Sequence, residues 1–358
     1  MSIKRTVVPE RNGRKSGLRR LIYRPQWQRQ DTQDDWLALK DRLRRTVARV
    51  PEVVIKVSGG GTKIAGVLRY MNYISRNGAL IASDEKGEGV SGRDNVKATH
   101  ASWDLDLQRA HDRKGAALHQ SFNIIFSMPA KTDPDKLFAA VHAFAREYFV
   151  RRQYLMVLHT PETDPSDSPP PHPHVHLAVR AEDEDGQRLC IRKSKLRLWR
   201  EAFAAELRAL GIEANATSRA ERGVTFKGRG SAEYHIKERG EVPHVETRRF
   251  VDAVLQLEHG RTELKPWEIA IAARRRSIVD KLTSSANRLR DEGATELAEQ
   301  VKRFARELPP LDTEMRKMQR AIIAQINERL KRDVDVSEKA EEEVKCSLVR
   351  KTDQSPRR

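Results

Sequence analysis

Apolar residues follow two different periods along this chain, which divide it into a mixed first part and a helical second part. Short apolar runs with strand character occur at 53–57, 119–128, 153–159 and 174–179. Between these runs, apolar residues at helical spacing predict helices at 34–50, 64–74, 134–150 and 193–210. Strand signals vanish beyond about residue 245, where helical patterns cover 251–257, 266–308 and 311–330.

Turn and capping residues define three of these strand and helix boundaries more closely. A glycine turn at 58–61 separates the first strand from the helix at 64–74. Asp133 precedes Pro134 and is typical of an N-cap, because its carboxylate can accept from the first free amides of a helix. Gly211 ends the helix that begins at Lys193.

The run at 174–179 carries two histidines on one face. Alternate side chains of a strand point the same way, so His174 and His176 share a face while Val175 and Leu177 point into the core. His159 closes the preceding strand, and a hairpin across the loop 160–173 would bring it beside the pair.

Three neutral imidazoles without a thiolate favour a catalytic divalent ion over a closed structural zinc site. The alternative interpretation is a set of surface histidines in a proline-rich hairpin. His172 lies between two prolines, before the regular strand, and is a weaker candidate ligand.

The helix at 64–74 carries two tyrosines at i and i+3, Tyr70 and Tyr73. A tyrosine can attack phosphorus and hold DNA covalently. Its pKa near 10 opposes this, and a metal ion or a nearby cation such as Arg76 would favour the phenolate. On their own, two tyrosines at this spacing are more typical of amphipathic packing than of a nucleophile.

Charge narrows the class of partner. The 358 residues include 68 Lys and Arg against 51 Asp and Glu, for a formal net charge of +17, which favours a polyanion. Much of the excess lies in residues 1–50. No apolar run approaches the ~20 residues that cross a bilayer, and no apolar signal segment begins the chain, so the sequence predicts a cytoplasmic protein without membrane insertion. Two cysteines exclude a disulfide framework.

Three segments together resemble the motifs of the MOBP-type relaxases, the conjugative mobilisation nucleases of the HUH endonuclease superfamily. They are NYISRNG around Tyr73, HQSFNIIFSMPAKTDPDKL at 119–137 and VLHTPETDPSDSPPPHPHVHLAV at 157–179. The resemblance covers about residues 51–235, and 214–223 looks like the end of such a domain. It implies a strand-specific endonuclease that nicks an origin of transfer in DNA and rejoins the ends without ATP.

The resemblance also implies roles for individual residues. Tyr73 would be the nucleophile of a 5′-phosphotyrosyl link, and His159, His174 and His176 would bind Mg²⁺ or Mn²⁺. The family usually has an acidic residue two positions after the first histidine, where this chain has Pro161. The candidates that remain for the assisting carboxylate are Glu162, Asp164 and Asp167.

Candidate DNA contacts lie after the histidine segment as well as beside the tyrosine. Arg219, Arg222 and Lys227 form a basic run interrupted by glycines, and Arg76 is a further candidate. The expected partners are single-stranded DNA at an origin of transfer, duplex DNA, and the accessory and coupling proteins of a transfer system.

The predicted architecture follows from these patterns and from the resemblance. We expect a basic N-terminal arm with one helix at 1–50, and an α/β (α+β) HUH relaxase domain with an antiparallel sheet and packed helices at 51–245. A helical region at 246–343 and a disordered tail at 344–358 would follow. The alternative functions are a rolling-circle replication initiator of the same superfamily and a DNA-binding accessory protein that cuts nothing.

Overall fold

The chain divides into two compact units. The computed structural model describes residues 33–105, 109–165, 169–225, 230–260 and 265–352. Of the predicted site residues, Asp167 and Lys227 lie outside these ranges, as does most of the expected N-terminal arm. The first unit ends at Thr217 and the second begins at Ser218, so the boundary falls inside the span 51–245 expected for one domain.

A six-stranded sheet forms the centre of the first unit. Its strands are β1 (Val54–Gly59), β2 (Ala82–Asp84), β3 (Gly89–Val90), β4 (Ser121–Ser127), β5 (Tyr154–His159) and β6 (His174–Arg180). Their order across the sheet is β1-β4-β6-β5-β2-β3, and all neighbours pair antiparallel. The expected antiparallel sheet is therefore confirmed. The two histidine strands, β5 and β6, are adjacent and central.

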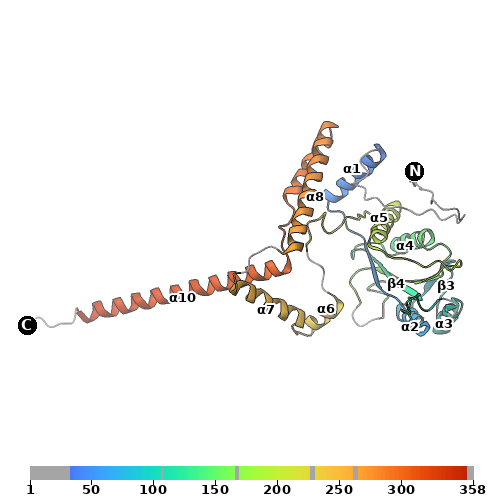
Figure 1. Cartoon of the computed structure of the whole chain (residues 1–358), viewed down its shortest axis with the longest axis horizontal. Coiled ribbons are helices and arrows are strands. Elements are labelled where there is room, and N and C mark those ends of the chain that lie inside the picture. Colours follow the sequence, from blue (N-terminus) through green and yellow to red (C-terminus); the bar gives the residue numbers. More distant parts are fainter. Residues whose placement is uncertain (1–32, 106–108, 166–168, 226–229, 261–264, 353–358) are drawn as a thin grey trace, which may run out of the picture. The chain divides into compact units, whose positions relative to one another are not determined.

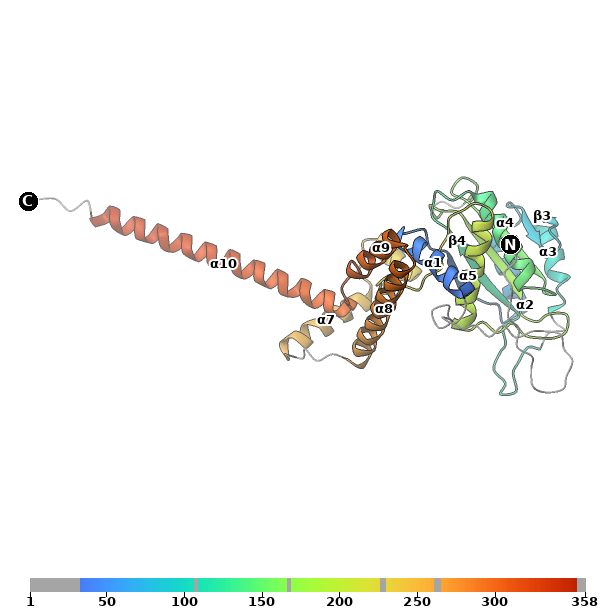
Figure 2. The ribbon, with the colours of Figure 1, turned by 90° about the horizontal axis from the view of Figure 1, so that it is seen from above.

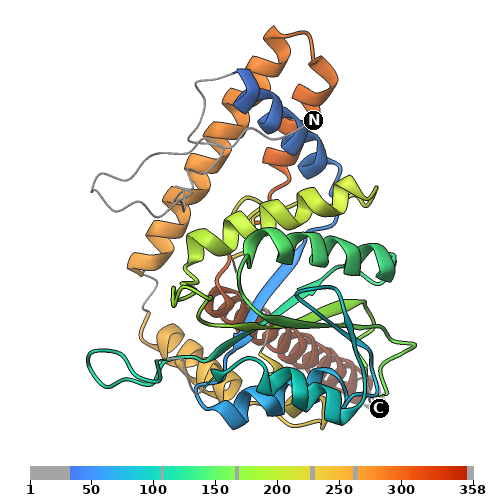
Figure 3. The ribbon, with the colours of Figure 1, turned by 90° about the vertical axis from the view of Figure 1, so that its right-hand side faces the viewer.

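Helices cover both faces of this sheet (Figures 1 and 3). On one face lie α4 (Pro134–Tyr148) and α5 (Lys193–Ala209), and on the other α2 (Ile64–Ile74) and α3 (Arg93–Ala101). The alternation of β6 separates the two cores, as its pattern predicts. Val175, Leu177 and Val179 join the core beneath α4 and α5, whereas Ala178 joins the core beneath α2 and α3.

The first helix, α1 (Gln33–Val47), belongs to the first unit. Arg42 lies 3.7 Å from the carboxylate of Glu201 on α5, and the Asn215 amide donates to the Thr46 hydroxyl at 3.2 Å. The sequence predicts this helix as part of a basic arm that precedes the domain. The charge of the segment does not reveal the few residues through which α1 contacts α5 and Asn215.

Local signals explain two helix boundaries well. The bounds of α2 agree with the predicted 64–74. At α4, the Asp133 carboxylate accepts from the backbone amides of Asp135 and Lys136, and Pro134 occupies the first turn. The short elements β2, β3, α3 and α6 (Ser231–Glu238) were not predicted, since two or three residues carry too little pattern and α3 has few apolar residues.

A left-handed turn follows α2. Arg76, Asn77 and Gly78 have φ angles of 51°, 56° and 84°. Left-handed backbone costs a non-glycine residue about 1–2 kcal/mol, so the surrounding structure must hold this turn in place. A Cβ on Gly78 would lie 2.3 Å from the backbone carbon of Gly92. The turn therefore packs against the segment that leads into α3.

Gly78→Ala is expected to lower the free energy of unfolding by about 2–4 kcal/mol, because it adds a steric clash to an unfavourable φ. Gly115→Ala is the matched control, since Gly115 also has a positive φ, +80°, but no atom within 4 Å of an added Cβ. Urea unfolding followed by circular dichroism measures both. Equal losses in the two variants would show that the contact with Gly92 is unimportant.

All the regular secondary structure described in the second unit is helical, as the sequence predicts for the region beyond about residue 245. It contains α6, α7 (His244–Glu258), α8 (Pro266–Asp291), α9 (Thr295–Arg306) and α10 (Glu314–Thr352). Helices α8 and α9 pack side by side (Figure 2), and an ion pair of 2.7 Å joins Arg249 of α7 to Glu314 of α10. Because α10 continues to Thr352, residues 344–352 of the expected tail are helical. None of the described helices is long and apolar enough to cross a membrane.

Candidate active site

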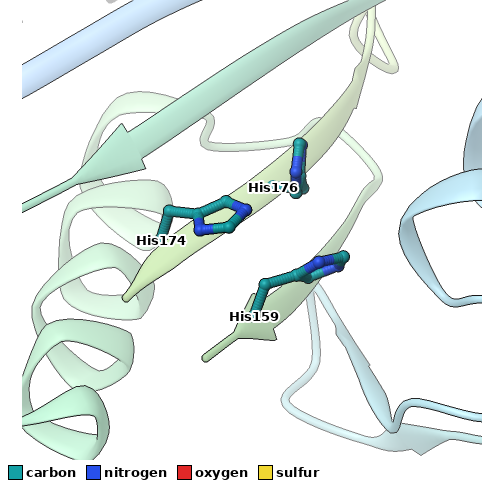
Figure 4. A group of neighbouring side chains, drawn as sticks. All are labelled: His159, His174 and His176. Carbon is teal, nitrogen blue, oxygen red and sulfur yellow. The ribbon is translucent and has the colours of Figure 1, made fainter. Parts of the chain in front are cut away.

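Three buried histidines meet where β5 ends and β6 begins. The register of the hairpin pairs His159 with His174, and His176 lies two residues further along β6 on the same face. One ring nitrogen from each lies within 4.8 Å of the others (Figure 4). The hairpin predicted across residues 160–173 therefore brings together the three imidazoles that the sequence singled out.

Each histidine has its Nδ1 atom engaged by a different group. The Nδ1 of His159 lies 2.8 Å from Oδ2 of Asp164, and that of His174 lies 3.2 Å from the carbonyl oxygen of His172. The Nδ1 of His176 lies 3.3 Å from the hydroxyl of Tyr70. A partner at Nδ1 fixes each ring, and it leaves Nε2 for coordination in His174 and His176, whereas Nε2 of His159 also contacts a backbone carbonyl oxygen. The arrangement fits a metal site with three imidazole ligands if a metal ion takes the place of that carbonyl at His159.

The lowered pKa values of two of these rings, His174 and His176, are consistent with a metal site. Burial, followed by the nearby imidazole of His159, lowers the pKa of His176 to about 3. Burial is also the main cause that lowers the pKa of His174. Both rings are therefore neutral at pH 7, which is the form that binds a metal ion.

The C-terminal end of α2 lies directly against the triad. The Nε2 atom of His159 is 2.6 Å from the carbonyl oxygen of Ile74, the residue after Tyr73. A metal ion at Nε2 would replace this hydrogen bond. The contact explains how a helix that is remote from β5 in sequence brings its tyrosines to the histidines.

The two tyrosines occupy different environments. The Tyr73 side chain is 56% exposed, and its ring centroid lies 6.1 Å from that of His176 and 6.3 Å from that of Tyr70. Tyr70 is mostly enclosed, and burial raises its pKa. Tyr73 is thus open to a large substrate beside the triad, whereas Tyr70 stays protonated and supports His176.

Arg76 connects the tyrosine helix to the carboxylate behind the triad. Its Nε and Nη2 atoms donate to the two oxygens of Asp164, each at 2.8 Å. Its Nη1 donates to the carbonyl oxygen of Tyr73 at 3.0 Å, and the guanidinium carbon lies 4.9 Å from the centroid of the Tyr73 ring. The arginine that the sequence offered as a DNA contact is therefore paired with Asp164 and stacked on Tyr73.

Of the candidate carboxylates in the described loop after β5, only one joins this group. Glu162 is exposed in the loop after β5, whereas Asp164 is 6% exposed and bonded to His159. Arg219 and Arg222 belong to the second unit, and their contacts with DNA stay predictions.

Sequence reasoning missed the supporting role of Tyr70 and of the His172 carbonyl group. The spacing of Tyr70 and Tyr73 at i and i+3 was the available signal, because it places both rings on one face of α2.

Comparison with known proteins found a family-model match over part of the chain and weak similarity to a solved structure. A solved structure from work on the molecular basis of vancomycin resistance transfer in Staphylococcus aureus is 15% identical to the chain, with a TM-score of 0.26. The similarity covers 47% of this chain and 98% of that one. No curated protein matches the chain significantly. Residues 73–211 match the family model of the relaxase nuclease domain, MobA/VirD2-like, and this match supports a DNA relaxase whose matched segment contains Tyr73 and all three histidines.

Proposed function

We propose that this protein is a relaxase of the MOBP type, which nicks one DNA strand at an origin of transfer and rejoins it during conjugative mobilisation. The observation that carries the proposal is the exposed Tyr73 ring beside three buried, convergent histidines within the span of the relaxase family match. An exposed nucleophile suits a polymeric substrate, and buried imidazoles suit a metal ion that must stay in place through repeated reactions.

Tyr73 acts as the nucleophile. Its phenol oxygen attacks the scissile phosphorus and loses its proton, and the bond from phosphorus to the 3′ oxygen breaks. The 3′ oxygen leaves as a hydroxyl, and the 5′ phosphate stays on Tyr73 as a phosphodiester. Since one phosphodiester replaces another, a 3′-hydroxyl can reverse the step without ATP.

His159, His174 and His176 would hold the divalent ion, Mg²⁺ or Mn²⁺, each through one ring nitrogen. When bound, the ion offsets negative charge on the scissile phosphate. The open coordination positions that a three-histidine set leaves are the ones that phosphate oxygens would take.

Asp164 takes the role of the acidic residue that the family has two positions after the first histidine, where this chain has Pro161. Its carboxylate accepts from Nδ1 of His159 and from Arg76, so its contacts suit the positioning of a metal ligand and of the Tyr73 segment. Arg76 thereby contributes to the site through Asp164 and Tyr73.

The remaining positively charged residues bind DNA outside the reaction centre. Arg219, Arg222 and Lys227 contact DNA phosphates, and the helical second unit binds duplex DNA or the accessory and coupling proteins of a transfer system. These events take place in the cytoplasm.

The proposal is tested with supercoiled plasmid. A plasmid that carries the cognate origin of transfer should become nicked and covalently linked to the protein when Mg²⁺ or Mn²⁺ is present. A plasmid with a rolling-circle replication origin serves as the comparison. Nicking of that plasmid alone would favour a replication initiator, and cleavage of neither would favour an accessory protein.

Asp164→Asn is expected to weaken Mn²⁺ binding about tenfold or more, because the amide no longer holds the charged hydrogen bond to His159. Isothermal titration of the metal-free protein with Mn²⁺ measures the loss. Glu162→Gln removes an exposed carboxylate from the same loop and should bind Mn²⁺ as the unaltered protein does. Equal affinities in the two variants would contradict the assignment of Asp164.

A further inference from the structure

The histidine face of the sheet continues from β6 across β4 to the edge strand β1. The register aligns His176 with Ile125 of β4 and Ile125 with Lys56 of β1. A parallel row aligns His174 with Ser127 and then Val54. Directly paired residues of antiparallel strands point to the same face, so both rows lead from the triad to β1 on one surface.

Along these rows the side chains become more exposed to solvent towards β1. His176 is buried and Ile125 is partly buried, while Lys56 is exposed and Val54 is 48% exposed. The alternate residues of β1, Ile55 and Val57, pack with the core under α4 and α5. Lys56 therefore projects from the histidine face, beside the part of the sheet that α2 covers.

Lys56 is a cation without a partner among the described residues, where neither an ion pair nor a side-chain hydrogen bond engages it. Arg76, the cation at the triad itself, is paired with Asp164. An exposed ammonium group at the end of a row that begins at the metal ligands is suited to an anion that extends across the sheet, and a DNA strand is such an anion.

We propose that Lys56 binds a phosphate of the cleaved strand, a short distance along that strand from the phosphate attacked by Tyr73. This proposal rests on the proposed function. Two interstrand spacings separate the backbones of Lys56 and His176, about 10 Å in total. Because DNA phosphates lie ~3.4 Å or more apart along a strand, the contacted phosphate is within about three positions of the scissile one.

An edge strand can also carry lysine for a different reason, since charge discourages pairing with the edge of another molecule. The two roles differ in what they predict. Protection of the edge involves no DNA and affects only self-association, whereas phosphate binding depends on the charge of one particular nucleotide linkage.

The first experiment measures binding of a single-stranded oligonucleotide with the nick site to protein that carries Tyr73→Phe, so that binding is observed without cleavage. Adding Lys56→Gln should weaken binding roughly fourfold at ~0.15 M salt and reduce the slope of log K against log salt by about 0.7. Lys86→Gln is the matched control, because Lys86 is exposed in the turn between β2 and β3, at the opposite edge of the sheet. Equal effects of the two lysine substitutions would overturn the proposal.

The second experiment locates the phosphate. Neutral methylphosphonate linkages are placed one at a time in the oligonucleotide, and Lys56→Gln should lose its effect at one linkage within about three positions of the nick site. An undiminished effect at every linkage would also overturn the proposal. Adduct formation by the unaltered protein is scored in parallel: failure of the Lys56 assignment alone leaves the adduct intact, whereas failure of the proposed function removes it.

Discussion

Tyr73→Phe is expected to abolish the covalent adduct between the protein and nicked DNA. The phenol oxygen is the atom that would bond to phosphorus, and phenylalanine keeps the ring contacts with Tyr70 and His176 while removing that oxygen. The measurement is denaturing electrophoresis of protein incubated with labelled origin DNA and Mn²⁺. Binding of the same DNA should change little, because the exposed hydroxyl contributes little to the uncleaved complex.

Tyr70→Phe is the matched control. Tyr70 lies one turn earlier on the same helix, but its hydroxyl contacts Nδ1 of His176, so its loss should weaken metal binding and leave the adduct detectable at high Mn²⁺. An adduct formed by Tyr73→Phe but not by Tyr70→Phe would transfer the nucleophile to Tyr70. If neither variant forms the adduct, the Tyr70 hydroxyl is needed for the reaction and does more than support His176.

The parts of the fold and site that depend on local pattern could be predicted from sequence. A period of two along β6 predicts that His174 and His176 share a face, and the position of His159 at the end of the preceding strand predicts that a hairpin brings it beside them. The N-cap at Asp133 and the bounds of α2 likewise depend on neighbouring residues. The triad could therefore be found without a structure.

The contacts between distant segments could not be predicted. The path of the loop after β5 turns the carboxylate of Asp164 inwards to His159 and leaves that of Glu162 in solvent. Arg76 reaches Asp164 from a left-handed turn at 76–78. Asparagine is enriched in left-handed backbone, as at Asn77, but no such preference predicts that conformation for Arg76. The sequence therefore did not reveal these internal contacts of Arg76, and its contact with DNA stays a prediction.

His174→Ala combined with His176→Ala is expected to eliminate Mn²⁺ binding in isothermal titration and, with it, nicking of plasmid DNA. Two of the three imidazoles are removed, and the single remaining ligand, His159, cannot hold a divalent ion alone. Circular dichroism and the thermal unfolding midpoint are recorded for the same preparation, because both side chains are buried and their removal leaves space beneath α2.

His172→Ala separates loss of metal ligands from general damage to the hairpin. The His172 side chain is outside the group of converging nitrogens, and the backbone carbonyl that holds His174 is unchanged by the substitution. Mn²⁺ binding should therefore persist in His172→Ala. A folded double variant that binds Mn²⁺ as tightly as the unaltered protein would exclude the triad as the metal site. Loss of binding in His172→Ala would add a fourth ligand, in which case fewer positions would remain open to the phosphate.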